Sequence, residues 1–153
     1  MKIRLELDDN ITEDEVIIRG RELSDEIIAL QKQIAEAVHT KMQLHVTKGE
    51  TSYFLRLDEI LFLETDGTSV AVHTDNQIYE TKQRLYELDE LLPGCFMRIS
   101  KSAIINTDKI RAVRKNITGA SEVEFFGSNK KAFVSRNYFK PLMSKIEEKR
   151  LKR

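Results

Sequence analysis

Cysteine, proline and tryptophan are scarce in this chain, with one Cys, two Pro and no Trp among 153 residues. A single cysteine excludes an internal disulfide. That residue, Cys95, follows Pro93-Gly94 and precedes Phe96, and we interpret it as a small packed side chain rather than a nucleophile or redox sensor. Few prolines and no low-complexity tract argue against a long disordered linker.

Long hydrophobic runs are also missing. Runs such as Ile60 to Leu63 fall far short of the roughly 20 apolar residues that cross a bilayer. Residues 1–5 alternate polar and apolar side chains and lack the apolar stretch of a signal peptide. Charged residues make up 33% of the chain, so we expect a cytoplasmic protein.

The sequence lacks the patterns of enzymes and metal sites. It has no glycine-rich phosphate loop, and His39, His45 and His73 are far apart and have no metal-ligand spacing with Cys95. We interpret each histidine as a surface or edge residue. We therefore expect no catalytic activity, no metal, no cofactor and no small-molecule substrate.

Charge is distributed very unevenly along the chain. Residues 1–93 contain 10 Lys and Arg against 20 Asp and Glu, whereas residues 94–153 contain 15 against 5. The net charge of zero therefore conceals a strongly basic C-terminal part. Such an excess of cations is typical of surfaces that contact phosphates.

Residues 1–41 are expected to form a small unit of strands and one helix. Apolar and polar residues alternate at 3–7, as in a half-buried strand, and 16–18 is a second short apolar run. Between residues 23 and 38, apolar side chains recur every three or four positions, as on one face of a helix. This face either packs on a small N-terminal sheet or contributes to a dimer contact.

From about residue 42 the apolar period changes to two, which predicts a mostly β domain over residues 42–150. Residues 81–92 are expected to form a helix that ends at Pro93-Gly94, and Ser135 is expected to cap a final helix. The predicted fold class is α+β, with a small N-terminal strand/helix unit followed by a mostly β domain with short helices. Its expected strands cover residues 42–46, 53–57, 60–65, 69–74, 96–99, 103–105, 110–114, 122–126 and 131–134.

The basic part carries its cations mainly on expected strands and turns, and we count Lys130 and Lys131 among the expected DNA contacts. Arginine can donate two parallel hydrogen bonds to a guanine edge, whereas lysine and serine suit phosphate oxygens. No helix-turn-helix pattern stands out, so DNA would be read from loops. The alternatives are a solvated basic surface without a ligand and an interaction module whose basic face binds an acidic partner. A third is an enzyme acting on a phosphorylated or nucleic-acid substrate, for which the sequence supplies no convincing set of residues.

Four ordered motifs in this region together resemble the LytTR family of bacterial DNA-binding domains. They are Ile-Leu-Phe-Leu-Glu-Thr-Asp-Gly at residues 60–67, Leu85 to Leu88, residues 96–106 and residues 134–138. The resemblance covers about residues 42–150. It implies a compact, mostly β domain whose loops enter successive major grooves of double-stranded DNA, and hence a sequence-specific transcription regulator.

The resemblance also implies which residues face DNA. They lie in the hairpin at residues 66–68, in the segment around Lys101 and at the start of the last helix. The expected contacts are Thr68, Arg98, Ser100, Lys101, Ser102, Arg136 and Asn137. Arg136 either contacts a base or forms a structural salt bridge, and Asn106 is expected to cap a turn rather than to contact DNA.

Many members of that family carry an N-terminal receiver domain, but about 41 residues are too few to form one. The chain instead resembles stand-alone LytTR regulators with a short N-terminal extension. That resemblance implies a homodimer that binds a pair of short repeats. It also implies a small membrane protein that restrains the regulator.

Overall fold

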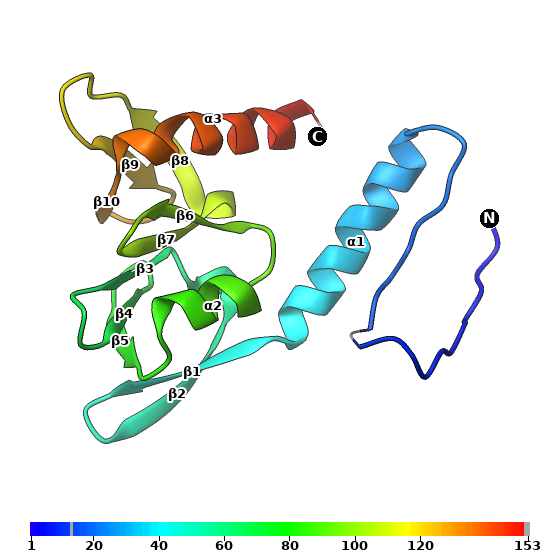
Figure 1. The fold of residues 1–153 in the computed structure, drawn as a ribbon, viewed down its shortest axis with the longest axis horizontal. Coiled ribbons are helices and arrows are strands. Elements are labelled where there is room, and N and C mark those ends of the chain that lie inside the picture. Colours follow the sequence, from blue (N-terminus) through cyan, green and yellow to red (C-terminus); the bar gives the residue numbers. More distant parts are fainter. Residues whose placement is uncertain (13, 152–153) are drawn as a thin grey trace.

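The computed structural model describes residues 1–12 and 14–151, with two antiparallel sheets and short helices following residue 42 (Figure 1). The fold is α+β, as the sequence predicted. The strands are β1 (Gln43–Lys48), β2 (Thr51–Arg56), β3 (Phe62–Thr65), β4 (Val70–His73), β5 (Ile78–Thr81), β6 (Phe96–Ser100), β7 (Ala103–Asn106), β8 (Ile110–Arg114), β9 (Ser121–Phe125) and β10 (Lys131–Val134). The helices are α1 (Asp25–Lys41), α2 (Leu85–Leu91) and α3 (Arg136–Leu151), with short 3-10 turns at Leu57–Glu59 and Thr107–Lys109.

The larger sheet has seven strands in the order β2-β1-β5-β4-β3-β7-β6, and the smaller has three in the order β10-β9-β8. At the centre of the larger sheet, Leu63 of β3 lies opposite Val72 of β4 and Ile104 of β7. All three side chains are completely buried. The apolar alternation of these segments therefore places their buried faces in register, as the period of two requires.

Two apolar cores hold the domain together. The first lies between the larger sheet and α2 and includes Leu63 and Leu88. The second lies between the two sheets and α3 and includes Ile99, Val123 and Leu142. A helix as short as α2 is unstable by itself, so it is the burial of its apolar side against the sheet that stabilises it.

The N-terminal strands expected at residues 3–7 and 16–18 are wrong, because neither segment forms a strand. A strand needs a neighbour for its backbone hydrogen bonds, and the described part of this chain offers these segments none. Their apolar side chains stay in solvent, with Ile3 100% exposed and Leu5 84% exposed.

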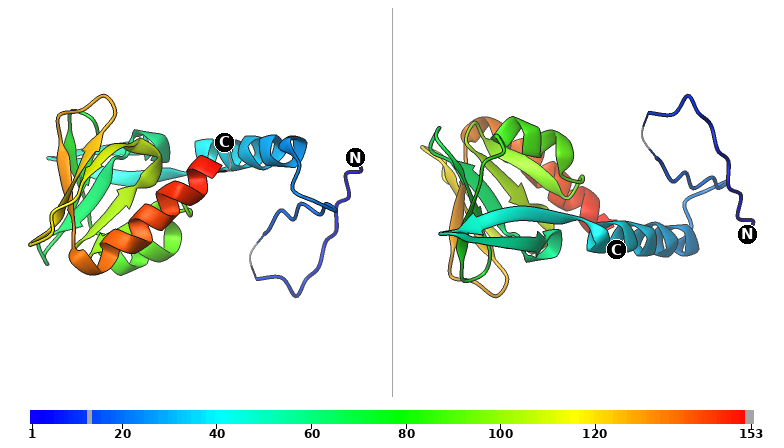
Figure 2. Two further views of the ribbon diagram at one scale, coloured as in Figure 1. Left: turned by 90° about the horizontal axis from the view of Figure 1, so that it is seen from above. Right: turned by 90° about the horizontal axis from the view of Figure 1, so that it is seen from below.

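The helix expected between residues 23 and 38 is confirmed as α1, but its packing is not. None of the described side chains of α1 is buried, and Leu23, at the start of its apolar stripe, is 68% exposed. Both views in Figure 2 show α1 and the segment before it extending away from the sheets. Packing on an N-terminal sheet is therefore wrong as the explanation of this stripe.

The helix expected at residues 81–92 begins later than the sequence indicated. Residues 78–81 form β5, which the sequence reading missed, and α2 covers only Leu85–Leu91. Thr81 is buried opposite Val70 of β4. Its β-branched side chain favours a strand over a helix.

Two smaller predictions are confirmed. The side chain of Asn106 caps the turn after β7 by accepting a hydrogen bond from the backbone N–H of Asp108 at 3.1 Å. Cys95 packs against the first core. Among the described residues, no helix combines the length and the apolar character needed to span a bilayer.

Candidate nucleic-acid interface

Three segments that are distant in the sequence meet at one edge of the domain, on the left in Figure 1 and opposite α1. Two backbone hydrogen bonds join them. The N–H of Thr65 donates to the carbonyl of Ser102, and the N–H of Ser135 donates to the carbonyl of Ile99, each at 2.9 Å. We call this surface the turn edge; it comprises residues 66–69, 100–102 and 135–137.

The β3–β4 turn is held by its own side chains. Oδ1 of Asp66 accepts hydrogen bonds from the Thr68 hydroxyl at 2.6 Å and from the Thr68 N–H at 2.9 Å. The hydroxyl bond, followed by the backbone bonds from Thr68 and Ser69, lowers the pKa of Asp66. Gly67 has φ +99°, a conformation that L residues rarely adopt. Thr68 is thereby fixed at the exposed tip, where its hydroxyl oxygen can accept a further hydrogen bond.

The β6–β7 turn presents Lys101 at its tip. Arg98 stabilises this turn, because its Nη1 donates to the carbonyl of Lys101 at 2.8 Å. The Nε of Arg98 also lies 3.8 Å from Oδ2 of Asp89. The hydroxyl of Ser100 accepts from the N–H of Ser102 at 3.2 Å. The Lys101 ammonium is therefore exposed on a turn whose backbone is fixed, and Arg98 shapes that turn.

The start of α3 places Arg136 and Asn137 beside that turn, and both are exposed. Ser135 directly precedes α3, the position expected of its cap, and its carbonyl accepts from the N–H of Tyr138 at 3.0 Å. The hydroxyl of Ser135 also donates to the carbonyl of Ile99 at 3.4 Å, which links α3 to β6. Arg136 forms no salt bridge with any residue that the structure describes. Its guanidinium is thus available to a ligand at the turn edge.

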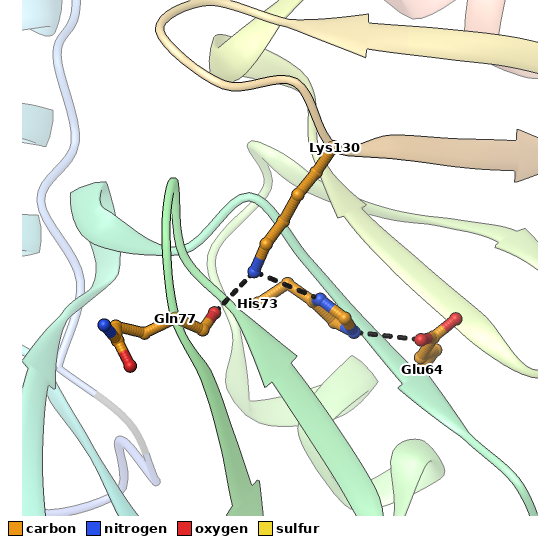
Figure 3. Close-up of polar contacts among 4 residues, drawn as sticks. All are labelled: Glu64, His73, Gln77 and Lys130. Carbon is orange, nitrogen blue, oxygen red and sulfur yellow. Dashed lines mark hydrogen bonds and ion pairs between the residues drawn. The ribbon is translucent and has the colours of Figure 1, made fainter.

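Lys130, which the sequence grouped with the DNA contacts, has a different environment (Figure 3). Its ammonium donates to the carbonyl of Gln77 at 2.6 Å and lies 3.4 Å from Nδ1 of His73. On the other side of the ring, Nε2 of His73 lies 2.9 Å from Oε1 of Glu64. Lys130 thus connects the smaller sheet to β4 and the turn after it, and burial lowers the pKa of its ammonium.

His73 is not the surface residue that the sequence suggested. Its side chain is only 10% exposed and stacks on Phe62 with 4.1 Å between the ring centroids. Nδ1 accepts from the Lys130 ammonium, so the neutral ring carries its proton on Nε2 and donates it to Glu64. Burial lowers the pKa of His73 below the ordinary value of 6.5, against an opposing effect of Glu64.

This environment predicts a stability change in mild acid. Because the pKa of His73 is lower in the folded state than the unfolded value of 6.5, the unfolded chain binds more protons just below that pH. The contribution of neutral His73 to the free energy of unfolding is therefore fully present above pH 6.5. It is lost as the pH falls toward the pKa of His73 in the folded state. Urea unfolding across this range is expected to show the loss in the parent chain and in His45→Gln, which changes an exposed histidine. The same loss in His73→Gln would contradict this assignment.

Lys131 lies next to the turn edge but is paired. Its ammonium is 2.5 Å from Oε1 of Glu122, and this hydrogen bond raises the pKa of Lys131.

A groove of about 600 Å³ between the sheets is lined by Lys131 together with Ser100, Ser102 and Ser135. The sequence-predicted residues thus divide into those on the turn edge (Thr68, Ser100, Lys101, Ser102, Arg136 and Asn137), one behind it (Arg98) and two in or beside this groove (Lys130 and Lys131).

Two cations that the sequence reading missed lie close to the turn edge. Lys82 and Arg84, both exposed, line a groove of about 320 Å³ together with Thr68 and Arg98. They were overlooked because the acidic balance of residues 1–93 was averaged over the whole segment. A count over residues 82–84 alone, with two cations and no acid, would have revealed them.

Comparison with known proteins adds an independent finding. The family model described as "LytTr DNA-binding domain" matches residues 50–147. An uncharacterized HTH-type transcriptional regulator of Staphylococcus aureus is 26% identical over 149 residues, which cover 95% of this chain and 98% of the relative. A second from the same species is 30% identical over 109 residues, covering 69% of this chain and 71% of the relative.

A solved structure also shares the fold. The LytTr DNA-binding domain of a putative methyl-accepting/DNA response regulator from Bacillus cereus superposes with a TM-score of 0.60 at 20% identity, covering 67% of this chain and 97% of that one. The described helices of the present chain include no two consecutive helices joined by a short turn, since strands separate α1 from α2 and α2 from α3. The shared fold is therefore the antiparallel β domain.

Proposed function

This chain belongs to the LytTR family of DNA-binding domains, and on that premise we propose that it is a transcription regulator that reads the major groove of double-stranded DNA from the turn edge. The observation that carries the proposal is the pair of backbone hydrogen bonds from Thr65 to Ser102 and from Ser135 to Ile99. They fix three exposed segments in one surface, as recognition of a defined sequence requires.

The chemistry of the turn edge divides between bases and phosphates. Arg136 is exposed without an ion pair among the described residues, and a guanidinium can bind O6 and N7 of guanine in a bidentate manner. Lys101, Ser100 and Ser102 offer an ammonium and two hydroxyls, which suit phosphate oxygens. Thr68 and Asn137 stand beside them as hydrogen-bonding groups of defined position.

The remaining predicted contacts have supporting roles in this proposal. Arg98 holds the β6–β7 turn through its bond to the carbonyl of Lys101. Lys131 lies beside the turn edge in an ion pair with Glu122. Lys130 keeps the two sheets together through Gln77 and His73. Lys82 and Arg84 extend the positive surface along the groove next to Thr68.

Replacing Lys101 with alanine is expected to lower affinity equally for specific and unrelated duplexes, because a phosphate contact carries no sequence information. The slope of log affinity against log salt should fall by about 0.9, the value for one neutralised phosphate of B-DNA. Fluorescence anisotropy at several salt concentrations measures both quantities. Lys32→Ala, which removes an exposed lysine of α1 on the opposite side, serves as the control, and an unchanged slope for Lys101→Ala would refute the phosphate contact.

We further propose that the regulator acts as a homodimer on two short repeats, in the cytoplasm where chromosomal DNA is accessible. A C2-symmetric dimer presents two copies of the turn edge, so its operator contains two equivalent half-sites. The membrane protein partner implied by the resemblance to stand-alone regulators belongs to this proposal as the component that restrains DNA binding.

Selection of bound duplexes from a random pool tests the proposed function. Enrichment of one short motif, present twice at a fixed spacing, is the expected result. Recovery of unrelated duplexes in proportion to the input would contradict sequence-specific recognition. Failure to retain any duplex at low salt would favour the alternative in which the basic face binds an acidic protein.

A further inference from the structure

The N-terminal extension leaves several large apolar side chains exposed. Ile3, Leu5 and Leu7 are 100%, 84% and 88% exposed, and Val16 and Ile17 are 66% and 59% exposed. Exposed apolar side chains mark an interaction site when they lie together on one surface. In the apolar stripe of α1, Ile27, Leu30 and Ile34 are only half-buried, and Val38 is 48% exposed.

Residues 3–7 belong to no helix or strand of the described chain, but one ion pair indicates how their side chains are arranged. Nη1 of Arg4 lies 3.3 Å from Oε1 of Glu6, two residues along the chain. Residues two apart share a face only in an extended chain, so this ion pair defines one polar face. Ile3, Leu5 and Leu7 then form the opposite, apolar face.

This segment is complementary to itself. If two copies pair in antiparallel fashion about Leu5, Ile3 lies opposite Leu7 of the partner subunit and Leu5 lies opposite Leu5 of the partner subunit. Arg4 then lies opposite Glu6 of the partner subunit, and each of these cross-strand pairs is favourable. Shifting the register by a single residue in one strand would oppose apolar to charged side chains.

From these observations we propose that residues 3–7 pair with the same segment of a second copy of this chain, and that the apolar stripes of the two α1 helices cover the ribbon. A two-stranded ribbon alone is only marginally stable in water. The half-buried stripe of α1 supplies the second apolar layer that such a ribbon needs. The occupant of this surface is therefore a second copy, and the contact is isologous.

This interface lies on the side of the molecule opposite the turn edge (Figures 1 and 2). Dimerisation and DNA contact therefore use separate surfaces. The link between the dimer and a pair of repeats rests on the proposed function, but the interface itself does not.

The test uses the whole 153-residue chain and measures its mass by light scattering after size-exclusion chromatography. The parent chain is expected to be a dimer at micromolar concentration and Leu5→Asp a monomer, because two buried carboxylates would meet at the symmetry axis. Ile117→Asp is the matched control, since Ile117 is an apolar residue that is 80% exposed outside the extension. A monomeric parent chain, or a Leu5→Asp variant that remains dimeric, would overturn the proposal.

Cross-linking tests the register. Leu5→Cys is expected to form a disulfide-linked dimer under mild oxidation, because opposed Cα atoms in an antiparallel pair are about 4.5–5.5 Å apart and a disulfide spans such distances. The parent chain, which has Cys95 alone, and Ile117→Cys are expected to stay uncross-linked. Absence of the covalent dimer from Leu5→Cys would overturn the register about Leu5.

DNA binding separates this inference from the proposed function. Leu5→Asp is expected to bind a duplex with a single repeat as the parent subunit does, and to lose the extra affinity for two repeats. A dimer that binds no duplex would contradict the proposed function and leave the interface intact. A monomer that binds paired repeats as tightly as the parent would overturn the interface and leave the DNA-reading surface intact.

Discussion

Replacing Arg136 with alanine is expected to weaken binding to the specific operator by about 5- to 150-fold, which corresponds to the 1–3 kcal/mol that a bidentate base contact contributes to discrimination. Binding to unrelated duplex should decline much less, because only one cation is removed from a surface that contains several. Arg136 is exposed at the start of α3 and has no ion pair among the described residues. Its substitution therefore removes no contact that stabilises the fold.

Competition binding with specific and unrelated duplexes measures this difference directly. Arg111→Ala is the matched control, because it removes the same charge from β8, where Arg111 pairs with Glu124 at 3.1 Å. An equal loss of affinity for both duplexes in Arg136→Ala would show that Arg136 contacts the DNA backbone instead of a base.

Replacing Leu142 with alanine is expected to reduce the free energy of unfolding by about 2–5 kcal/mol, the range for truncating a fully buried leucine. Leu142 is completely buried in the core that joins α3 to both sheets. The same helix begins with Arg136, so its packing also positions the proposed base contact. If the substitution displaces α3, the affinity for the operator should decline as well.

Urea unfolding followed by circular dichroism measures this loss. Leu91→Ala in α2 is the control, since Leu91 is 52% exposed and its truncation should cost less than about 1 kcal/mol. Similar losses for the two variants would contradict the claim that packing against the sheets holds α3.

The β domain was largely predictable from the sequence because its buried positions recur with a period of two. Leu63 and Ile104, which face each other in adjacent strands, both lie in segments that were expected to be strands. The exception is β5, which pairs with β4. Its residues Glu80 and Thr81 are polar, so the segment shows no apolar alternation. Periodicity identifies a strand only where the buried face is apolar.

The prediction of N-terminal strands was wrong for a different physical reason. Alternation at residues 3–7 correctly identifies a segment suited to pairing, but it does not say which chain supplies the neighbour. The isolated subunit provides none, so the segment remains exposed. The apolar stripe of α1 is a similar case. The sequence predicted the helical spacing of its apolar residues, but not which surface they pack against.

The sequence suggested a candidate site because charge and motif are local properties, and its DNA contacts stay predictions. Partners are not local, and they decide what each cation does. Lys130 and Arg98 were grouped with Lys101, yet the first is held by Gln77 and His73 and the second by the carbonyl of Lys101. His73 is buried because its ring stacks on Phe62. The sequence around His73 does not indicate this contact, because Phe62 lies in another strand.

A gel-shift titration with the DNA upstream of the gene, at two salt concentrations and with unrelated duplex as competitor, tests the central claim most directly. A discrete complex that survives the competitor and weakens as salt rises is the result expected of a regulator that reads DNA from the turn edge. A complex that the competitor removes entirely, or no complex at low salt, would contradict sequence-specific recognition of that DNA.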